Sequence, residues 1–175
     1  MKKLVLLIMC IGLLLCGCGT GDAARFADLR ETVLAAQKLS FTALVQAEYE
    51  DKTAEFTLAF SMEGDEYSVE ILEPELVRGM RAHVKSGETH LEYDGAILDI
   101  GTLNDRGLCP MSALPFLADA IRSAHLDFTW TENGLAAAQL TPSDGMTVKL
   151  WLGESGFPTD AEIIYNEKTV VFISI

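Results

Sequence analysis

Cysteine and histidine are the residue types here that most readily do chemistry, and their spacing limits what that chemistry is. The three histidines, His83, His90 and His125, are scattered, and Cys109 is the only cysteine beyond the first 18 residues. No His-Glu-x-x-His spacing and no zinc-binding set of Cys and His is present. A dyad of Cys109 with a histidine has no local signature, and there is no Gly-x-Ser-x-Gly motif. We therefore predict no metal site, no cofactor and no enzyme.

The clusters of acidic residues and the two tryptophans are weaker indications of a binding site. The acidic groups are Glu63-Asp65-Glu66 and Glu70-Glu73-Glu75, and they lack the Asp-x-Asp-x-Asp-Gly order of a calcium loop. We interpret them as solvated charges at turns. Trp130 and Trp151 either stack on a sugar or pack on a sheet, and the sequence leaves both alternatives open.

Cys18 is the cysteine whose surroundings favour a reaction. Lys2 and Lys3 are followed by an uncharged, mainly apolar run of 12 residues, 4–15, and then by small residues. This order is typical of a secretory signal peptide. The apolar run is shorter than the roughly 20 residues of a membrane-spanning helix. The chain is therefore predicted to carry an export signal.

Leu15-Cys16-Gly17-Cys18 resembles the lipobox of bacterial lipoproteins. The resemblance implies cleavage after Gly17, a diacylglyceryl thioether on Cys18, and often a further acyl chain such as palmitate on the new amino terminus. The chemistry suits cysteine, because a thiolate is a good nucleophile for alkylation. Two acyl chains hold a protein on a membrane stably, whereas one binds reversibly. We expect a domain tethered to the cell membrane on its extracytoplasmic side; the alternative is cleavage near Gly19 or Ala24 and a free secreted domain.

Composition limits the partners of the exported part. Removing residues 1–17 leaves 158 residues with 13 − 2 = 11 basic and 26 acidic side chains, a net charge of 11 − 26 = −15. Such a charge excludes nucleic acid as a partner and disfavours docking on anionic lipid. Cys109 is left without a second cysteine, so a hydrophobic core rather than a disulfide must stabilise the domain.

Hydrophobic periodicity predicts two helices and about ten strands. Apolar residues at helical spacing indicate a helix over residues 22–39, with Asp22 as its N-cap, and another over 112–124, with Pro115 in its first turn. Elsewhere apolar and polar residues alternate, as in antiparallel strands with one buried face. Asp94-Gly95, Asn133-Gly134 and Asp144-Gly145 indicate hairpin turns. The pattern is that of a single α+β domain.

The order of these elements resembles the LolA/LolB-like superfamily of envelope lipoprotein carriers and receptors. Four segments carry the resemblance: Leu39-Ser40-Phe41-Thr42-Ala43, Ile71-Leu72-Glu73-Pro74, Leu91-Glu92-Tyr93-Asp94-Gly95 and Gly156-Phe157-Pro158. The resemblance implies a curved antiparallel sheet, an incomplete barrel, with two helices on its concave side and an apolar cavity for acyl chains. The chain then divides into a signal peptide (1–17), a lipidated tether (18–22) and a LolA/LolB-like domain (23–175).

The function expected from this resemblance is non-enzymatic. A membrane-anchored envelope lipoprotein would bind a lipid or lipoprotein acyl chain in the concave cavity, at about 0.8 kcal/mol per buried methylene. The candidate lining residues are Phe41, Val45, Tyr49, Phe56, Leu58 and Phe60. The alternative is the same fold with a filled core, acting as a protein–protein interaction module of the cell envelope. A cleft that gathers Cys109 with a histidine would instead indicate an envelope hydrolase.

Overall fold

The fold is built from two helices and one large sheet. The structure, a computed structural model, describes residues 20–49, 52–85, 88–101 and 107–175, so the predicted signal peptide and Cys18 lie outside the described residues. The helices are α2 (Thr20–Ala35) and α3 (Pro110–Ser123). The strands are β1 (Lys38–Tyr49), β2 (Lys52–Glu63), β3 (Glu66–Glu73), β4 (Arg81–Lys85), β5 (Glu88–Tyr93), β6 (Ala96–Gly101), β7 (His125–Glu132), β8 (Leu135–Ser143), β9 (Met146–Leu152), β10 (Pro158–Tyr165) and β11 (Lys168–Ser174), with a 3-10 turn, η1 (Glu75–Val77), between β3 and β4.

All eleven strands form one antiparallel sheet in the order β6-β5-β4-β3-β2-β1-β11-β10-β9-β8-β7. The chain runs outward from β1 to one edge at β6, crosses by way of α3 to the other edge at β7, and returns to place β11 beside β1. Because β6 and β7 do not pair, the sheet stays open. The predicted single domain with an incomplete barrel is confirmed, with eleven strands rather than about ten.

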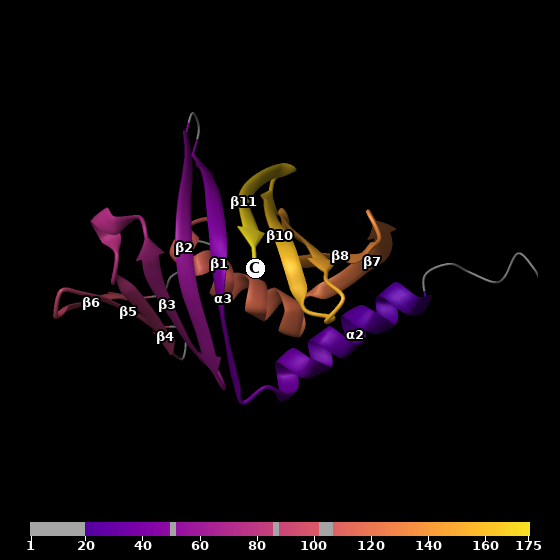
Figure 1. The fold of residues 1–175 in the computed structure, drawn as a ribbon, viewed down its shortest axis with the longest axis horizontal. Coiled ribbons are helices and arrows are strands. Elements are labelled where there is room, and N and C mark those ends of the chain that lie inside the picture. Colours follow the sequence, from indigo (N-terminus) through magenta and orange to yellow (C-terminus); the bar gives the residue numbers. More distant parts are fainter. Residues whose placement is uncertain (1–19, 50–51, 86–87, 102–106) are drawn as a thin grey trace, which may run out of the picture.

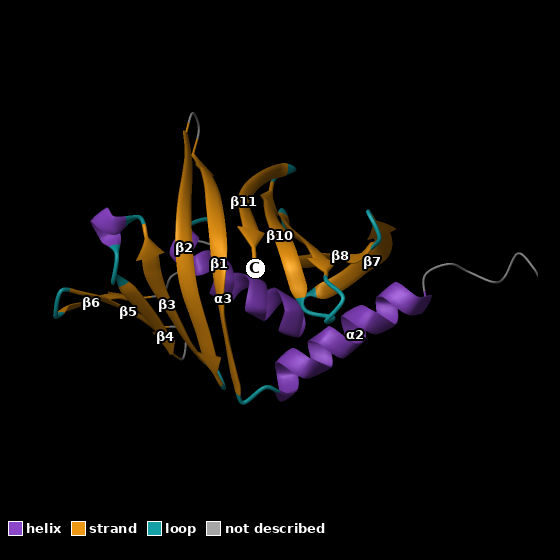
Figure 2. Ribbon diagram, viewed as in Figure 1, coloured by secondary structure: helices purple, strands orange, loops and turns teal. Residues whose placement is uncertain are grey.

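The helices cover the concave side of this sheet, as predicted. Figure 1 shows the two halves of the sheet curving around α3, with α2 along the half that contains β7 and β8. Figure 2 shows the same two helices against an otherwise all-strand framework. Phe26 and Leu29 of α2, Leu114 and Leu117 of α3, and the inward residues of the sheet form one buried core. Among the described residues, this buried core runs from Phe26 to Ile173, and Ile175 packs against it.

The boundaries of α2 differ from the prediction at both ends. The helix begins at Thr20, so Asp22 lies in its first turn rather than at the N-cap, and it accepts a hydrogen bond from Thr131 Oγ1 at 2.7 Å. The helix ends at Ala35, because the strand alternation already begins at Lys38 and Leu39 pairs with Met62. Of the residues predicted at the end of the helix, Lys38 and Leu39 therefore belong to β1, and Ala36 and Gln37 connect the two elements.

The start of α3 also differs. The helix begins two residues earlier than expected, with Cys109 in an extended conformation as N-cap and Pro110 in the first turn. Pro115 consequently lies inside the helix instead of in its first turn. Pro110 marks the start of α3, because a proline at the first helical position lacks only an amide hydrogen that the helix does not use.

The predicted Asx-Gly turns lie between consecutive strands. In two of them both central residues have positive φ: Asp94-Gly95 (50° and 77°) between β5 and β6, and Asn133-Gly134 (49° and 82°) between β7 and β8. This backbone matches the right-handed twist of a hairpin, which is why the dipeptide indicates the turn. Among the described residues, no helix is long and apolar enough to cross a membrane.

Candidate functional site

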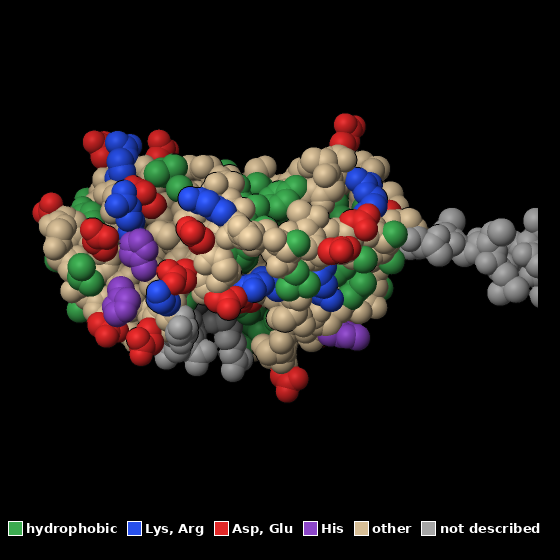
Figure 3. Space-filling model, turned by 90° about the horizontal axis from the view of Figure 1, so that it is seen from below, with side chains coloured by type: hydrophobic (Ala, Val, Ile, Leu, Met, Phe, Trp, Pro, Cys, Tyr) green, Lys and Arg blue, Asp and Glu red, His purple; other side chains and the backbone are tan. Residues whose placement is uncertain are grey.

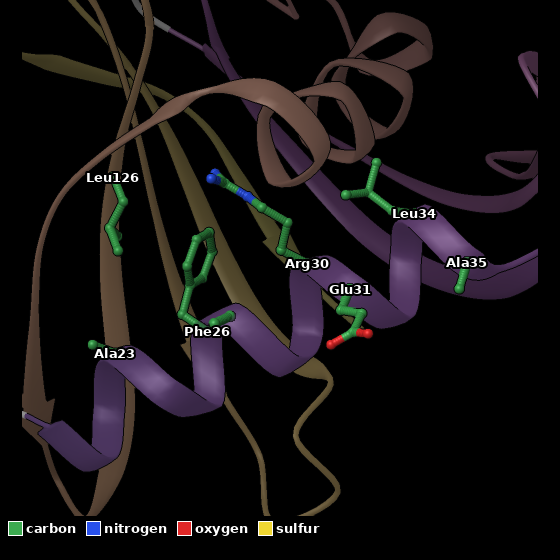
Figure 4. A pocket seen from close by; sticks show the side chains of 8 residues that line it. Ala23, Phe26, Arg30, Glu31, Leu34, Ala35 and Leu126 are labelled. Atoms are coloured by element: carbon green, nitrogen blue, oxygen red, sulfur yellow. The ribbon is translucent and has the colours of Figure 1, made fainter.

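An apolar pocket of about 570 Å³ lies between α2 and the start of β7. Its lining residues are Ala23, Phe26, Ala27, Arg30, Glu31, Leu34 and Ala35 of α2 and Leu126 of β7. Figure 4 shows Leu126 facing Phe26 across the pocket, with Arg30 and Leu34 projecting from the same side of the helix as Phe26. Pockets of roughly 300–1,000 Å³ accommodate small ligands, so this volume is sufficient for part of a lipid chain.

The helical repeat explains how α2 builds one wall of this pocket. Phe26, Arg30 and Leu34 are spaced by four residues, which places them in one row along a helix. Phe26 is buried and forms the floor, whereas the side chain of Leu34 is 55% exposed at the rim. Ala23, Ala27 and Ala35 carry only a methyl group and leave the space above the helix open.

Arg30 holds the end of α3 against α2. Its Nε donates to the carbonyl oxygen of Ile121 at 2.7 Å, and its Nη2 donates to that of Ala124 at 2.6 Å. Carbonyl groups in the last turn of a helix lack helical partners, and a cation there also suits the helix dipole. The guanidinium carbon lies 4.8 Å from the centre of the Phe26 ring. Partial burial lowers the pKa of Arg30, and two of its N–H groups donate to these carbonyls.

A second polar network ties α3 to the strands on its other side. The hydroxyl of Tyr67 on β3 donates to Asp119 Oδ1, and Arg122 donates to Tyr67 Oη at 3.0 Å and to Asp65 Oδ1 at 2.8 Å. Burial and the neighbouring carboxylate of Asp119 raise the pKa of Tyr67 to about 12. The C-terminal end of α3 is therefore held from two sides, by Arg30 of α2 and by Tyr67 of β3, which gives the pocket a rigid neighbour.

The six predicted cavity residues share the concave face of the β1–β2 hairpin. Cross-strand pairing places Phe41 opposite Phe60 and Val45 opposite Phe56. Val45, Leu58 and Phe60 are fully buried in the core, Phe41 and Phe56 are half-buried, and Tyr49 is exposed. Phe41 also contacts Phe157, with ring centres 5.7 Å apart. The pocket beside α2 is lined by other residues, and lipid binding at the six stays a prediction.

Sequence reasoning found only part of the observed pocket. The helical spacing over residues 22–39 predicts an apolar stripe of Phe26, Leu29, Val33 and Ala36, so Phe26 is the pocket residue that the sequence indicates. Leu34 lies outside that stripe, and its excess hydrophobicity on the otherwise polar face was the one available signal. Leu126 joins the pocket from a strand about a hundred residues along the chain, which no local pattern indicates.

The residues considered for catalysis lie in separate elements. Cys109 caps α3, and its Sγ donates to Ser112 Oγ at 3.4 Å on the same helix. His83 and His90 face each other on β4 and β5, and His83 Nε2 lies 3.6 Å from Glu92 Oε2. Within the described residues, no group of three or more His, Cys, Asp or Glu side chains is placed to hold a metal ion.

The acidic groups make ion pairs at the surface instead. Glu66 pairs with Lys85, and Glu70 Oε2 lies 3.0 Å from Arg81 Nε across the β3–β4 pair. Asp65 forms an ion pair with Arg122. Figure 3 views the molecule from the side of α2 and shows acidic and basic side chains interspersed with smaller apolar areas. Exposed pairs of this kind contribute little to stability.

Comparison with known proteins identifies the fold. No protein family model matches the chain, and no curated protein sequence matches it. Among solved structures, a LolA superfamily protein from Nitrosomonas europaea matches with a TM-score of 0.50 and 16% identity, covering 85% of this chain and 74% of that one. A domain from Vibrio parahaemolyticus assigned to outer membrane lipoprotein sorting matches with a TM-score of 0.50 and 14% identity, covering 83% of this chain and 72% of the other.

A third structural match is a conserved protein from Thermus thermophilus, with a TM-score of 0.50 and 14% identity, covering 87% of this chain and 83% of that one. The matches extend over most of the described residues. The chain therefore has a LolA-like fold, and the predicted resemblance in architecture is confirmed.

Proposed function

We propose that this protein is a lipid-anchored, non-enzymatic lipoprotein of the cell envelope that binds an acyl chain in the pocket between α2 and β7. The observation that carries the proposal is the pocket itself: about 570 Å³, with six of its eight lining residues apolar. The signal-like N-terminus and the lipobox-like segment ending at Cys18 support the anchor and the extracytoplasmic location.

The chemistry of the pocket suits an acyl chain better than a polar ligand. Two N–H groups of Arg30 already donate to carbonyl groups at the end of α3, and Glu31 points away from Phe26 and Leu34 in Figure 4. Binding would rest on apolar contact. Burying about eight methylenes contributes roughly 6 kcal/mol, at about 0.8 kcal/mol each. That corresponds to a dissociation constant on the order of tens of micromolar.

Titration with a fluorescent fatty acid tests this proposal on the chain from residue 19 onward, which keeps every core residue of the described part. We expect saturable binding in the micromolar range. Leu34→Glu should weaken it by at least about tenfold, since a carboxylate replaces an apolar wall. Leu34 is 55% exposed, so the substitution leaves the core intact.

Leu76→Glu is the matched control, because Leu76 is an 87% exposed leucine on η1, between β3 and β4 on the half of the sheet that does not contain β7. Equal binding by both variants would show that the fatty acid does not bind in this pocket. An absence of binding by the unchanged chain would refute acyl-chain binding altogether.

One surface favours the second candidate function, an interaction module. Edge strand β6 has all six residues exposed, including Ile97 at 73% and Leu98 at 59%. An unpaired apolar edge can accept a strand from a partner protein. A photo-crosslinking residue at position 97 in the living cell would give one defined adduct if this edge is an interface, and no adduct if it is not.

A further inference from the structure

Three aromatic side chains form a cluster on the outer surface of the sheet near β7. This aromatic cluster consists of Phe128 and Trp130 on β7 and Trp151 on β9. The rings of Phe128 and Trp130 are centred 5.5 Å apart, and those of Trp130 and Trp151 are 6.4 Å apart in an edge-to-face arrangement. Phe128 is 53% exposed, and both tryptophans are half-buried.

Strand register places the aromatic cluster on the convex face. Trp130 and Trp151 are both cross-strand partners of Ala137 on β8. The neighbours of Ala137 on that strand, Ala136 and Ala138, belong to the core on the opposite face. Ala137 itself is only 1% exposed, because the two indoles cover it. The apolar rings are thus fixed in place on the outside of the molecule.

Glu132 satisfies the polar ends of both tryptophans. Its Oε2 accepts a hydrogen bond from Trp151 Nε1 at 2.7 Å and from Trp130 Nε1 at 3.2 Å. These bonds lower the pKa of Glu132. The cluster therefore has an apolar body and one hydrated, charged side, which is the character of side chains that lie at the boundary of a bilayer.

The N-terminus of α2 meets β7, the strand that carries Phe128 and Trp130, on the concave face opposite to this cluster. Thr131, which directly follows Trp130, donates from Oγ1 to Asp22 Oδ2 at 2.7 Å. Cys18 precedes Asp22 by four residues, so at most roughly 14 Å of extended chain separates them. A lipid on Cys18 would therefore enter the bilayer near the sheet edge formed by β7, the strand that carries two rings of the aromatic cluster.

We propose that the aromatic cluster is a membrane-contact surface, which lies in the interfacial layer of the bilayer that holds the lipid on Cys18. The proposal rests on the proposed lipidation of Cys18. Tryptophan and other aromatic side chains favour this layer, where a ring meets acyl chains and a polar end meets water. The contact does not depend on charge, which agrees with a strongly acidic domain.

A glycan is the less suitable occupant of the cluster. The two indole planes are inclined by 81°, so they offer no shared flat platform for a sugar ring. Their N–H groups already donate to Glu132 and are not available to sugar hydroxyls. The proximity to the anchor also favours the membrane.

Tryptophan fluorescence tests the proposal directly, because Trp130 and Trp151 are the only two tryptophans of the chain. The full lipoprotein, purified with its lipid, is reconstituted into phosphatidylcholine vesicles with or without bromine on the acyl chains near the headgroup. We expect brominated lipid to quench most of the tryptophan emission, which stays intact in detergent without bromine. Phe128→Ser should reduce the quenching, while Ile97→Ser, an exposed position on the opposite edge strand, should leave it unchanged.

The outcomes separate this inference from the proposed function. Vesicle flotation with no quenching would overturn the membrane contact and leave the anchor standing. A chain that does not float would overturn the lipidation of Cys18 and the inference that rests on it. Quenching that disappears in Leu34→Glu would assign the signal to lipid in the α2 pocket and overturn the cluster as the contact. Tryptophan emission that brominated lipid does not quench, but whose wavelength shifts when peptidoglycan fragments are added, would overturn the membrane contact and indicate that the cluster binds a glycan.

Discussion

Replacing Arg30 with methionine removes the contacts that hold the end of α3 on α2 while keeping most of the apolar stem. The substitution deletes two hydrogen bonds to the carbonyls of Ile121 and Ala124 and the contact with the Phe26 ring. Hydrogen bonds from a charged group contribute about 1.5–3 kcal/mol each, and an exposed cation–π contact about 0.5–1 kcal/mol. Because water replaces part of these bonds at a half-buried site, we expect a net loss of about 2 kcal/mol.

Thermal unfolding followed by circular dichroism measures this loss. A change of 1 kcal/mol shifts Tm by about 2–4 °C in a domain of this size, so Arg30→Met should lower Tm by about 4–8 °C. Arg25→Met is the control on the same helix, because Arg25 donates a single hydrogen bond, to Gly153 O at 2.9 Å. Its Tm should fall by roughly half as much. Equal shifts for the two variants, or no shift for Arg30→Met, would refute the assigned role of Arg30.

Three further predictions concern titration and turn geometry. The pKa of Tyr67 is raised from 10 to about 12, so the neutral phenol stabilises the fold fully below pH 10, and this stabilisation is lost as the pH rises through about 12. Between pH 10 and 12, the Tm of Tyr67→Phe should therefore fall less than the Tm of the unchanged chain. The carboxyl of Glu132 should titrate below its usual value of 4.5 in an NMR titration, and the tryptophan emission should change with the same midpoint; a normal midpoint would exclude its bonds to the indoles. Gly107→Ala should lower the free energy of unfolding in urea more than Gly134→Ala does. Both glycines have positive φ, but only at Gly107 would the new Cβ lie 2.8 Å from a side chain, that of Phe116. Similar losses in the two variants would contradict this steric clash.

Local patterns predicted most of the fold because they report local physics. Phe41, Ala43 and Val45 alternate with mostly polar neighbours, which predicts that they share the buried face of β1, and they lie on that face in the structure. Asp94-Gly95 and Asn133-Gly134 adopt positive φ at both central residues, as a tight hairpin requires. The helix ends were less predictable, because Leu39 fits a helical stripe as well as a strand until its pairing with Met62 is known.

The candidate site depends on long-range packing, which the sequence does not encode in any one segment. Phe60 and Leu58 were placed on the correct face, but α3 and the rest of the core bury them. The pocket forms where α2 meets β7, between Phe26 and Leu126, and these elements meet only because the chain crosses from edge to edge of the sheet. The aromatic cluster is similar, since Trp130 and Trp151 come together only through their common partner Ala137.

The central claim, that the pocket beside α2 binds an acyl chain, is tested most directly by photo-crosslinking with a fatty acid that carries a diazirine on its chain. Peptide mass spectrometry then locates the adducts. We expect adducts on residues 20–35 of α2 and on the start of β7 around Leu126, and unlabelled fatty acid should compete them away. Adducts confined to the β1–β2 hairpin would move the site to the concave face of the sheet, and scattered adducts that excess fatty acid does not compete away would contradict acyl-chain binding.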